Sequence, residues 1–166
     1  VADRLTGATA NPIIRNAQER RQLEVISEYL CSRGYTELEL DERPSDPMED
    51  MPPGTFAFRL GVCGQTQDGG EVNIPVDVVI KPPDAASGDM PVLVEAKSAG
   101  DFANVNKRRK EEAIKAQQLR ARHGEHVRLL LFLCGYFDST YLGYEAAEGL
   151  DWVWEHRIND FQDIGL

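Results

Sequence analysis

Residues 74–97 read IPVDVVIKPPDAASGDMPVLVEAK. Two apolar runs, VDVVI and PVLV, flank a segment rich in Pro, Asp, Gly and Ser, and this composition is typical of two strands joined by a turn. Charged residues occupy positions that are normally apolar in such strands: Asp77 interrupts the first run, and Glu95 and Lys97 follow the second. The stretch therefore predicts a β-hairpin that carries charged side chains at one end.

The geometry of a hairpin brings these charges together. Side chains at positions i and i+2 of a strand point to the same face, so Glu95 and Lys97 share a face and Ala96 points away. Pairing of the two strands allows Asp77 to lie close to Glu95. Ionised groups beside a core are costly unless they are paired or bind a metal, which favours a chemical role. The structural alternative is that Asp77 caps a turn and that Glu95 and Lys97 form an ordinary exposed ion pair, since a short E-x-K pattern is weak alone.

The spacing of the motif favours the chemical role. A Pro-Val-Asp precedes the E-x-K by the length of a hairpin, and a basic helix is predicted after it. Pro75, Asp77, Glu95 and Lys97 resemble the PD-(D/E)XK nuclease signature, with Val76 inserted between the proline and the aspartate.

Longer segments are similar to the catalytic half of XamI-type restriction endonucleases. They read PVDVVIKP, VEAKSAGDFANVNKRRKEE and LLFLCGYFDSTYLGYEAAEGLDWVWEHR, and the similarity covers most of residues 11–166. The resemblance implies an α/β fold with a PD-(D/E)XK restriction-endonuclease-like core, in which helices flank a mixed central sheet of four to five strands. It also implies a type II restriction endonuclease that hydrolyses phosphodiester bonds of double-stranded DNA at specific sites. Two alternatives use the same core: a DNA repair or mobile-element nuclease, and a DNA-binding module that does not cleave.

The resemblance also implies a role for each charged residue. Clustered carboxylates bind hard cations through oxygen, and a bound cation activates water and neutralises charge on a phosphate. Asp77 and Glu95 are implied as catalytic ligands of Mg²⁺, for which Mn²⁺ can substitute, and the Ala96 carbonyl is a candidate third ligand. Lys97 is expected near the attacking water and the phosphate, and the sequence leaves open whether it acts as a general base. The family implies a homodimer in the full-length protein.

A further carboxylate is out of place on the first predicted helix, residues 17–32. Its apolar face carries Glu19, whereas Glu24 and Glu28 fall on the opposite face. Two explanations fit Glu19. It lies at the metal site, because this helix should pack across the sheet that carries the two carboxylates, or it pairs with Arg15 one turn earlier. The first explanation is favoured.

A basic cluster begins ten residues after Lys97, at the start of a helix predicted over residues 105–123. Cations near a helix N-terminus oppose the helix dipole, and bound phosphates would supply the missing negative charge. The alternative is a solvated, ion-paired helix start, because two glutamates follow directly. The candidate DNA-binding residues are Asn104, Asn106, Lys107, Arg108, Arg109 and Lys110.

The composition fits a DNA-handling protein only when the charge is divided along the chain. The net charge of −10 is unfavourable for binding phosphate, but residues 97–128 hold nine Lys or Arg against four Asp or Glu. That segment carries +5 and the remainder −15, so a basic face on an acidic body is predicted. The 166 residues suit one domain with an ordinary core.

Three observations bear on compartment and completeness. Three widely spaced cysteines make no disulfide framework, and no apolar run approaches the roughly 20 residues that span a bilayer, so a cytoplasmic protein with no membrane partner is expected. The start at Val1, with neither a methionine nor a signal-peptide pattern, indicates a fragment or a processed chain. We expect a lead-in over residues 1–16, with a turn or extended segment at Asn11-Pro12, and one nuclease domain over residues 17–166.

Periodicity predicts the order of the remaining elements. After the first helix come three strands, a helical crossover, a fourth strand and a short helix, with a loop over residues 43–54. The strands are expected at residues 55–62, 72–80, 91–96 and 128–134, and the last helix at residues 139–147. A short strand is possible at residues 35–40, and residues 150–156 fit either a final strand or a turn of helix.

Overall fold

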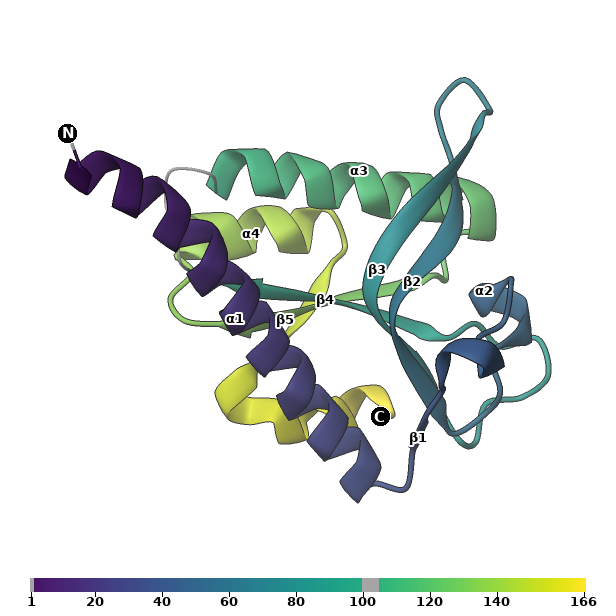
Figure 1. Cartoon of the computed structure of the whole chain (residues 1–166). Coiled ribbons are helices and arrows are strands. Elements are labelled where there is room, and N and C mark those ends of the chain that lie inside the picture. The colour runs from purple at the N-terminus through teal and green to yellow at the C-terminus, as the bar shows by residue number, and fades with distance from the viewer. Residues whose placement is uncertain (1, 100–104) are drawn as a thin grey trace.

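The computed structural model describes the backbone of residues 2–99 and 105–166, and the side chains of residues 16–99, 107 and 109–166 (Figure 1). In chain order its elements are α1 (Ala2–Ser32), β1 (Thr36–Glu37), η1 (Leu40–Glu42), α2 (Pro47–Asp50), β2 (Thr55–Gln65), β3 (Glu71–Lys81), β4 (Val92–Ser98), α3 (Val105–His123), β5 (Arg128–Cys134), α4 (Ser139–Ala147), β6 (Asp151–Trp154) and η3 (Glu155–Ile164). The predicted α/β class and the bounds of α3, β5 and α4 are confirmed.

One mixed sheet orders its strands β1-β2-β3-β4-β5-β6. Strands β2, β3 and β4 form the predicted antiparallel meander, and α3 crosses to β5, which runs parallel to β4. The predicted count of four to five strands is too low, because the described residues form six. The edge strands β1 and β6 have two and four residues, which is too short for a period of two to be read reliably from sequence.

The first helix, predicted to begin at residue 17, begins earlier, because α1 runs from Ala2 to Ser32 and includes most of the expected lead-in. The turn or extended segment at Asn11-Pro12 is therefore wrong. A proline inside a helix removes one backbone hydrogen bond and disfavours the helical conformation of the residue before it, but a long helix can tolerate this local cost.

The predicted loop over residues 43–54 contains a short helix. Asp46 caps α2, because its carboxylate accepts a hydrogen bond from the backbone N–H of Met48 at 3.0 Å. Pro47 follows at the first helical position, where a missing N–H costs nothing. An Asp-Pro pair that reads as a loop signal is here the start of a helix.

Two apolar layers cover the two faces of the sheet. On one face, Val78 and Val94 pack with the side chains of α1 and η3. On the other, Val79 and Leu93 pack with the buried face of α3. Figure 1 shows α1 and η3 along one side of the strands and α3 along another. Side chains two residues apart on a strand point to the same face. Asp77 is therefore on the face of Val79, and Glu95 and Lys97 are on the face of Leu93. Both are the face that α3 covers.

Two smaller expectations concern cysteines and membranes. Cys31, Cys63 and Cys134 are all free thiols, as predicted. None of the helices formed by residues 2–99 and 105–166 is both long enough and apolar enough to cross a membrane.

One polar side chain ties α1 to the sheet. Gln22 is buried, and its Nε2 donates hydrogen bonds to the carbonyls of Lys97 and Phe132, each at 3.2 Å. These carbonyls lie on β4 and β5, so the contact fixes the helix at the end of β4 that carries the charged residues.

Replacing Gln22 with Leu should lower the free energy of unfolding by about 1–3 kcal/mol, since two buried hydrogen bonds are lost at an otherwise similar volume. Urea denaturation measures the change. Glu24→Leu, on the exposed side of the same helix, is the matched control and should stay within about 0.5 kcal/mol of wild type. Equal stability of the two variants would contradict a role for Gln22 in holding α1.

Candidate active site

The charged residues of the hairpin lie where two strands separate. Pairing between β3 and β4 ends at Val78 and Val94, while β4 stays paired with β5 as far as Ser98. Just beyond that point, the backbone N–H of Ala96 donates to Oδ2 of Asp77 at 2.8 Å. The Asp77 side chain thus accepts the hydrogen bond that a backbone carbonyl of β3 would otherwise accept. The predicted approach of Asp77 to the end of β4 is confirmed.

A cavity of about 250 Å³ opens at this point. It brings together the five residues predicted for catalysis and metal binding. Its lining consists of Glu19, Gln22, Asp77, Glu95, Ala96, Lys97, Ser98 and Glu111.

Glu95 is the most buried carboxylate of the cavity, at 2% exposed. Two lysines compensate its charge: Nζ of Lys115 lies 3.0 Å from Oε1, and Nζ of Lys97 lies 3.4 Å from Oε2. Lys115 also donates to the carbonyl of Pro75 at 2.9 Å. Lys115 therefore bridges β3 and β4 from α3, and holds the orientation of Glu95.

The electrostatics of the site differ between Asp77 and Lys97. Burial, and then the charge of Glu95, raise the pKa of Asp77 to about 6, against the opposing hydrogen bond from Ala96. Burial alone would lower the pKa of Lys97, but Glu95, Glu112 and Asp77 outweigh it and raise the pKa above its ordinary value. At neutral pH Lys97 is therefore an ammonium group, and Asp77 carries a charge for which its surroundings do not fully compensate.

The donor set suits a hard cation. Two carboxylates and the Ala96 carbonyl offer oxygen, and Mg²⁺ is commonly held by one or two carboxylates while it keeps several waters. A bound cation would offset the burial and the charge of Glu95 that raise the pKa of Asp77. Among the described side chains of residues 16–99, 107 and 109–166, no three or more His, Cys, Asp or Glu are grouped as a complete metal site.

Glu19 lies at the cavity, as one of its two explanations requires, but it also has an ion-pair partner. Nη2 of Arg59 lies 3.2 Å from Oε1 of Glu19, and both side chains are partly or largely exposed. The side chain of Arg15, the partner in the other explanation, lies outside the described residues. Arg59 was not predicted from sequence as a site residue.

Arg59 has an unusual backbone conformation. It lies on β2 between the residues paired with Val78 and Val76, and so opposite Asp77. Its φ is 54°, and among the described residues it is the one non-glycine residue whose φ is positive. Such a conformation is disfavoured for a side chain with a Cβ and is often found at functional sites. No periodicity in the sequence of β2 indicates it.

The described members of the basic cluster do not line this cavity, although Lys107 pairs with Glu111, which does. Lys107 is exposed and 3.9 Å from Glu111, Lys110 is exposed, and the guanidinium of Arg109 stacks 3.6 Å from the ring centre of Tyr144. None of these three basic residues lines the cavity. Asn104 lies outside the described residues, as do the side chains of Asn106 and Arg108.

Two residues of α3 reach the site without having been predicted to do so. Glu112 and Lys115 occur one turn apart, on the same helical face as buried Ala116 and Leu119. That spacing is the signal that could have found them. Charged residues on the apolar face of a helix need partners, and here the partners are Lys97 and Glu95.

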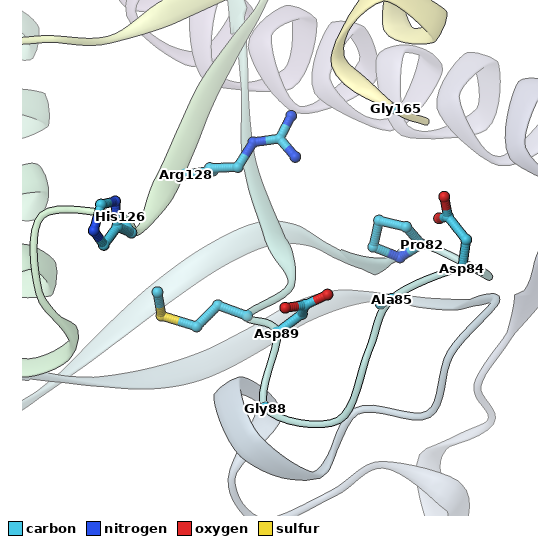
Figure 2. A pocket seen from close by; sticks show the side chains of 9 residues that line it. Pro82, Asp84, Ala85, Gly88, Asp89, His126, Arg128 and Gly165 are labelled. Atoms are coloured by element: carbon cyan, nitrogen blue, oxygen red, sulfur yellow. The ribbon is translucent and has the colours of Figure 1, made fainter.

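A larger hollow of about 430 Å³ lies at the other end of the hairpin (Figure 2). Asp84 and Asp89 come from the β3–β4 connection, His126 from the turn before β5, and Arg128 from the first residue of β5. Its charges serve the loop backbone: the Asp89 carboxylate accepts from the Ala86 N–H at 2.7 Å, and Arg128 donates to a backbone carbonyl of η3. The smaller cavity, with its buried carboxylate and lysine, is therefore the better candidate for chemistry.

Comparisons with known proteins place the chain among restriction enzymes. The chain is 58% identical over 165 residues to the type II restriction enzyme SalI of Streptomyces albus G, a match that covers 99% of this chain and 51% of the relative. The chain thus spans about half the length of the curated relative it matches. A Vibrio cholerae protein of known crystal structure superposes with a TM-score of 0.42 at 16% identity, over 64% of this chain and 25% of that one. A structural similarity at that level carries no conclusion.

The sequence profile of one family matches nearly the whole chain. It is the profile of the XamI restriction endonuclease, and it covers residues 1–154. A match of this extent, together with the identity to SalI, decides the relationship. The chain belongs to the XamI restriction endonuclease family.

Proposed function

We propose that the full-length protein is a type II restriction endonuclease and that this chain carries its PD-(D/E)XK core. It hydrolyses phosphodiester bonds at specific sites of double-stranded DNA with Mg²⁺, and Mn²⁺ can substitute. The observation that carries the proposal is the convergence of Asp77, Glu95 and Lys97 on one cavity at the point where β3 leaves β4. The presence of all three groups argues against a module that binds DNA without cleaving it.

The residues divide the chemistry between them. Asp77, Glu95 and the Ala96 carbonyl would hold the cation, which when bound supplies an activated water and relief of phosphate charge. Lys97, as an ammonium group, donates hydrogen bonds to a phosphate oxygen and orients the attacking water, rather than accepting its proton. Lys115 keeps Glu95 in place through its bonds to Glu95 and Pro75.

We expect the full-length protein to cut both strands of a duplex as a homodimer. A single site of this kind cuts one strand at a time, so cutting a duplex in one encounter requires two sites. The homodimer is therefore part of the proposal for the full-length protein.

The core assignment is tested by Asp77→Ala, Glu95→Gln and Lys97→Ala in the full-length protein. Each should reduce Mg²⁺-dependent cleavage of a duplex that holds the target site by on the order of a hundredfold or more, because each removes charge that acts on the reacting phosphate. Single-turnover cleavage on gels measures the rate. Glu125→Gln, an exposed change after α3, should cleave as wild type. A wild-type rate in any of the three would reject this active site.

Glu19→Gln tests whether the first helix contributes to the metal site. Because Glu19 lines the cavity beside Asp77, the variant should need more Mg²⁺ for half-maximal cleavage, while its melting temperature changes little, since its ion pair with Arg59 is largely exposed. Glu24→Gln, on the exposed side of α1, is the control. An unchanged Mg²⁺ requirement would leave Glu19 with a structural role only.

The basic cluster is proposed to bind the DNA backbone. Lys107→Ala and Lys110→Ala, both at exposed positions of α3, should weaken binding to all duplexes alike. Each lost phosphate contact should reduce the slope of log K against log salt by about 0.9, as measured by fluorescence anisotropy over a range of salt concentrations. Arg122→Ala, near the other end of α3, is the comparison. Unchanged affinity and slope would make the cluster a solvated helix face.

A further inference from the structure

A group of buried carboxylates lies behind the active site, between α3 and α4. Glu112 is 2% exposed and Glu145 is fully buried. The hydroxyl of buried Tyr141 donates to Oε2 of Glu112 at 2.8 Å. On the other side, Oε1 of Glu112 lies 3.4 Å from Nζ of Lys97. The group thus connects α4 to the active-site lysine through one carboxylate of α3.

Burying these carboxylates costs the fold free energy. Within the described residues, Oε1 of Glu112 has the ion pair with Lys97 at 3.4 Å, and both carboxylate oxygens of Glu145 are buried and accept no hydrogen bond from a donor group. Groups of this kind cost free energy, and apolar residues of similar size would serve packing as well or better. A role in chemistry is the physical alternative to a role in stability.

The surroundings of Glu145 favour its neutral form. Burial, and then Glu112, raise the pKa of Glu145 to about 8, against the charges of Lys97 and Arg109. A protonated Glu145 is neutral at pH 7 and has an O–H that can serve as a hydrogen-bond donor toward Glu112. Tyr141 and Glu145 then support one carboxylate, and that carboxylate faces Lys97.

We propose that Glu112 is a positioning residue for Lys97. Nζ of Lys97 lies 3.4 Å from Glu95 on one side and 3.4 Å from Glu112 on the other. An ammonium group has three hydrogens, so two carboxylates fix its direction and leave the third hydrogen for the cavity that Lys97 lines. With Glu95 as its one partner, the four-carbon side chain would be held by a single ion pair, and the direction of its ammonium group would not be fixed.

The geometry distinguishes this role from that of a metal ligand. Glu112 is not part of the cavity lining, and its two oxygens face Tyr141 and Lys97. It therefore acts through Lys97. The inference rests on the proposed function of Lys97 in DNA cleavage.

The test measures Glu112→Gln and Tyr141→Phe in the full-length protein, with Glu125→Gln as the exposed control. Glu112→Gln keeps the volume and the Tyr141 bond but removes the charge, so kcat should fall by on the order of 10- to 100-fold. KM for duplex and the Mg²⁺ concentration for half-maximal rate should not change. Tyr141→Phe should show a smaller fall of the same kind. A shift of the Mg²⁺ requirement would overturn the proposal, because Glu112 would then act at the metal.

A double-mutant cycle with Lys97→Ala tests the coupling. In that background, whose residual rate is followed with excess protein, Glu112→Gln should change cleavage less than twofold. It should also raise the melting temperature, because Lys97→Ala leaves the buried charge of Glu112 unpaired. A full effect of Glu112→Gln in the Lys97→Ala background, or no rise in melting temperature, would overturn the positioning role alone. A Lys97→Ala protein that cleaves as wild type would overturn both the positioning role and the proposed function of Lys97.

Discussion

The separation of β3 from β4 is the constraint on which the site depends. The ladder ends at Val78 and Val94, and the amide of Ala96 turns to the carboxylate of Asp77 at 2.8 Å. Had the ladder continued, the amide would pair with backbone and no cavity would open beside Glu95. A charged side chain in place of a carbonyl partner satisfies the amide, as a buried N–H requires. The same bond holds the carboxylate at the cavity.

Burying charge in this cavity requires a balance that α3 completes. Glu95 on β4 is almost wholly buried, and its charge is offset by Lys97 of its own strand and Lys115 of α3. Lys97 in turn is shared with Glu112 of α3. Positive and negative groups therefore alternate from the sheet into the helix layer. Such a network is satisfied only in the folded chain, so the apolar packing of α3 and the charge pattern of the site depend on each other.

The hairpin and the placement of its charges were predictable because their signals are local. Strand periodicity and the turn composition place Asp77 beside Glu95 and put Lys97 on the same face, and the structure agrees. The bounds of α3 were equally clear, since its residues favour a helix over a length that no other element disturbs. The start of α1 was not, because the local Asn11-Pro12 signal is opposed by the continuation of a long helix. A proline in a helix has a local free-energy cost, and the hydrogen bonds of the rest of the helix can outweigh that cost.

Residues that complete the site from a distance were beyond local signals. Glu112 belongs to a run of six charged residues, KRRKEE, which by itself predicts a solvated helix start. Counting back from Ala116 and Leu119 places Glu112 and Lys115 on the buried face, but it names no partner for either charge. Arg59 is the same problem in a strand, since no feature of its own sequence indicates its φ of 54° or its ion pair with Glu19. In each case the residue type is explained only when another element brings the complementary charge nearby. The unusual residues of this chain therefore mark the places where elements distant in sequence meet.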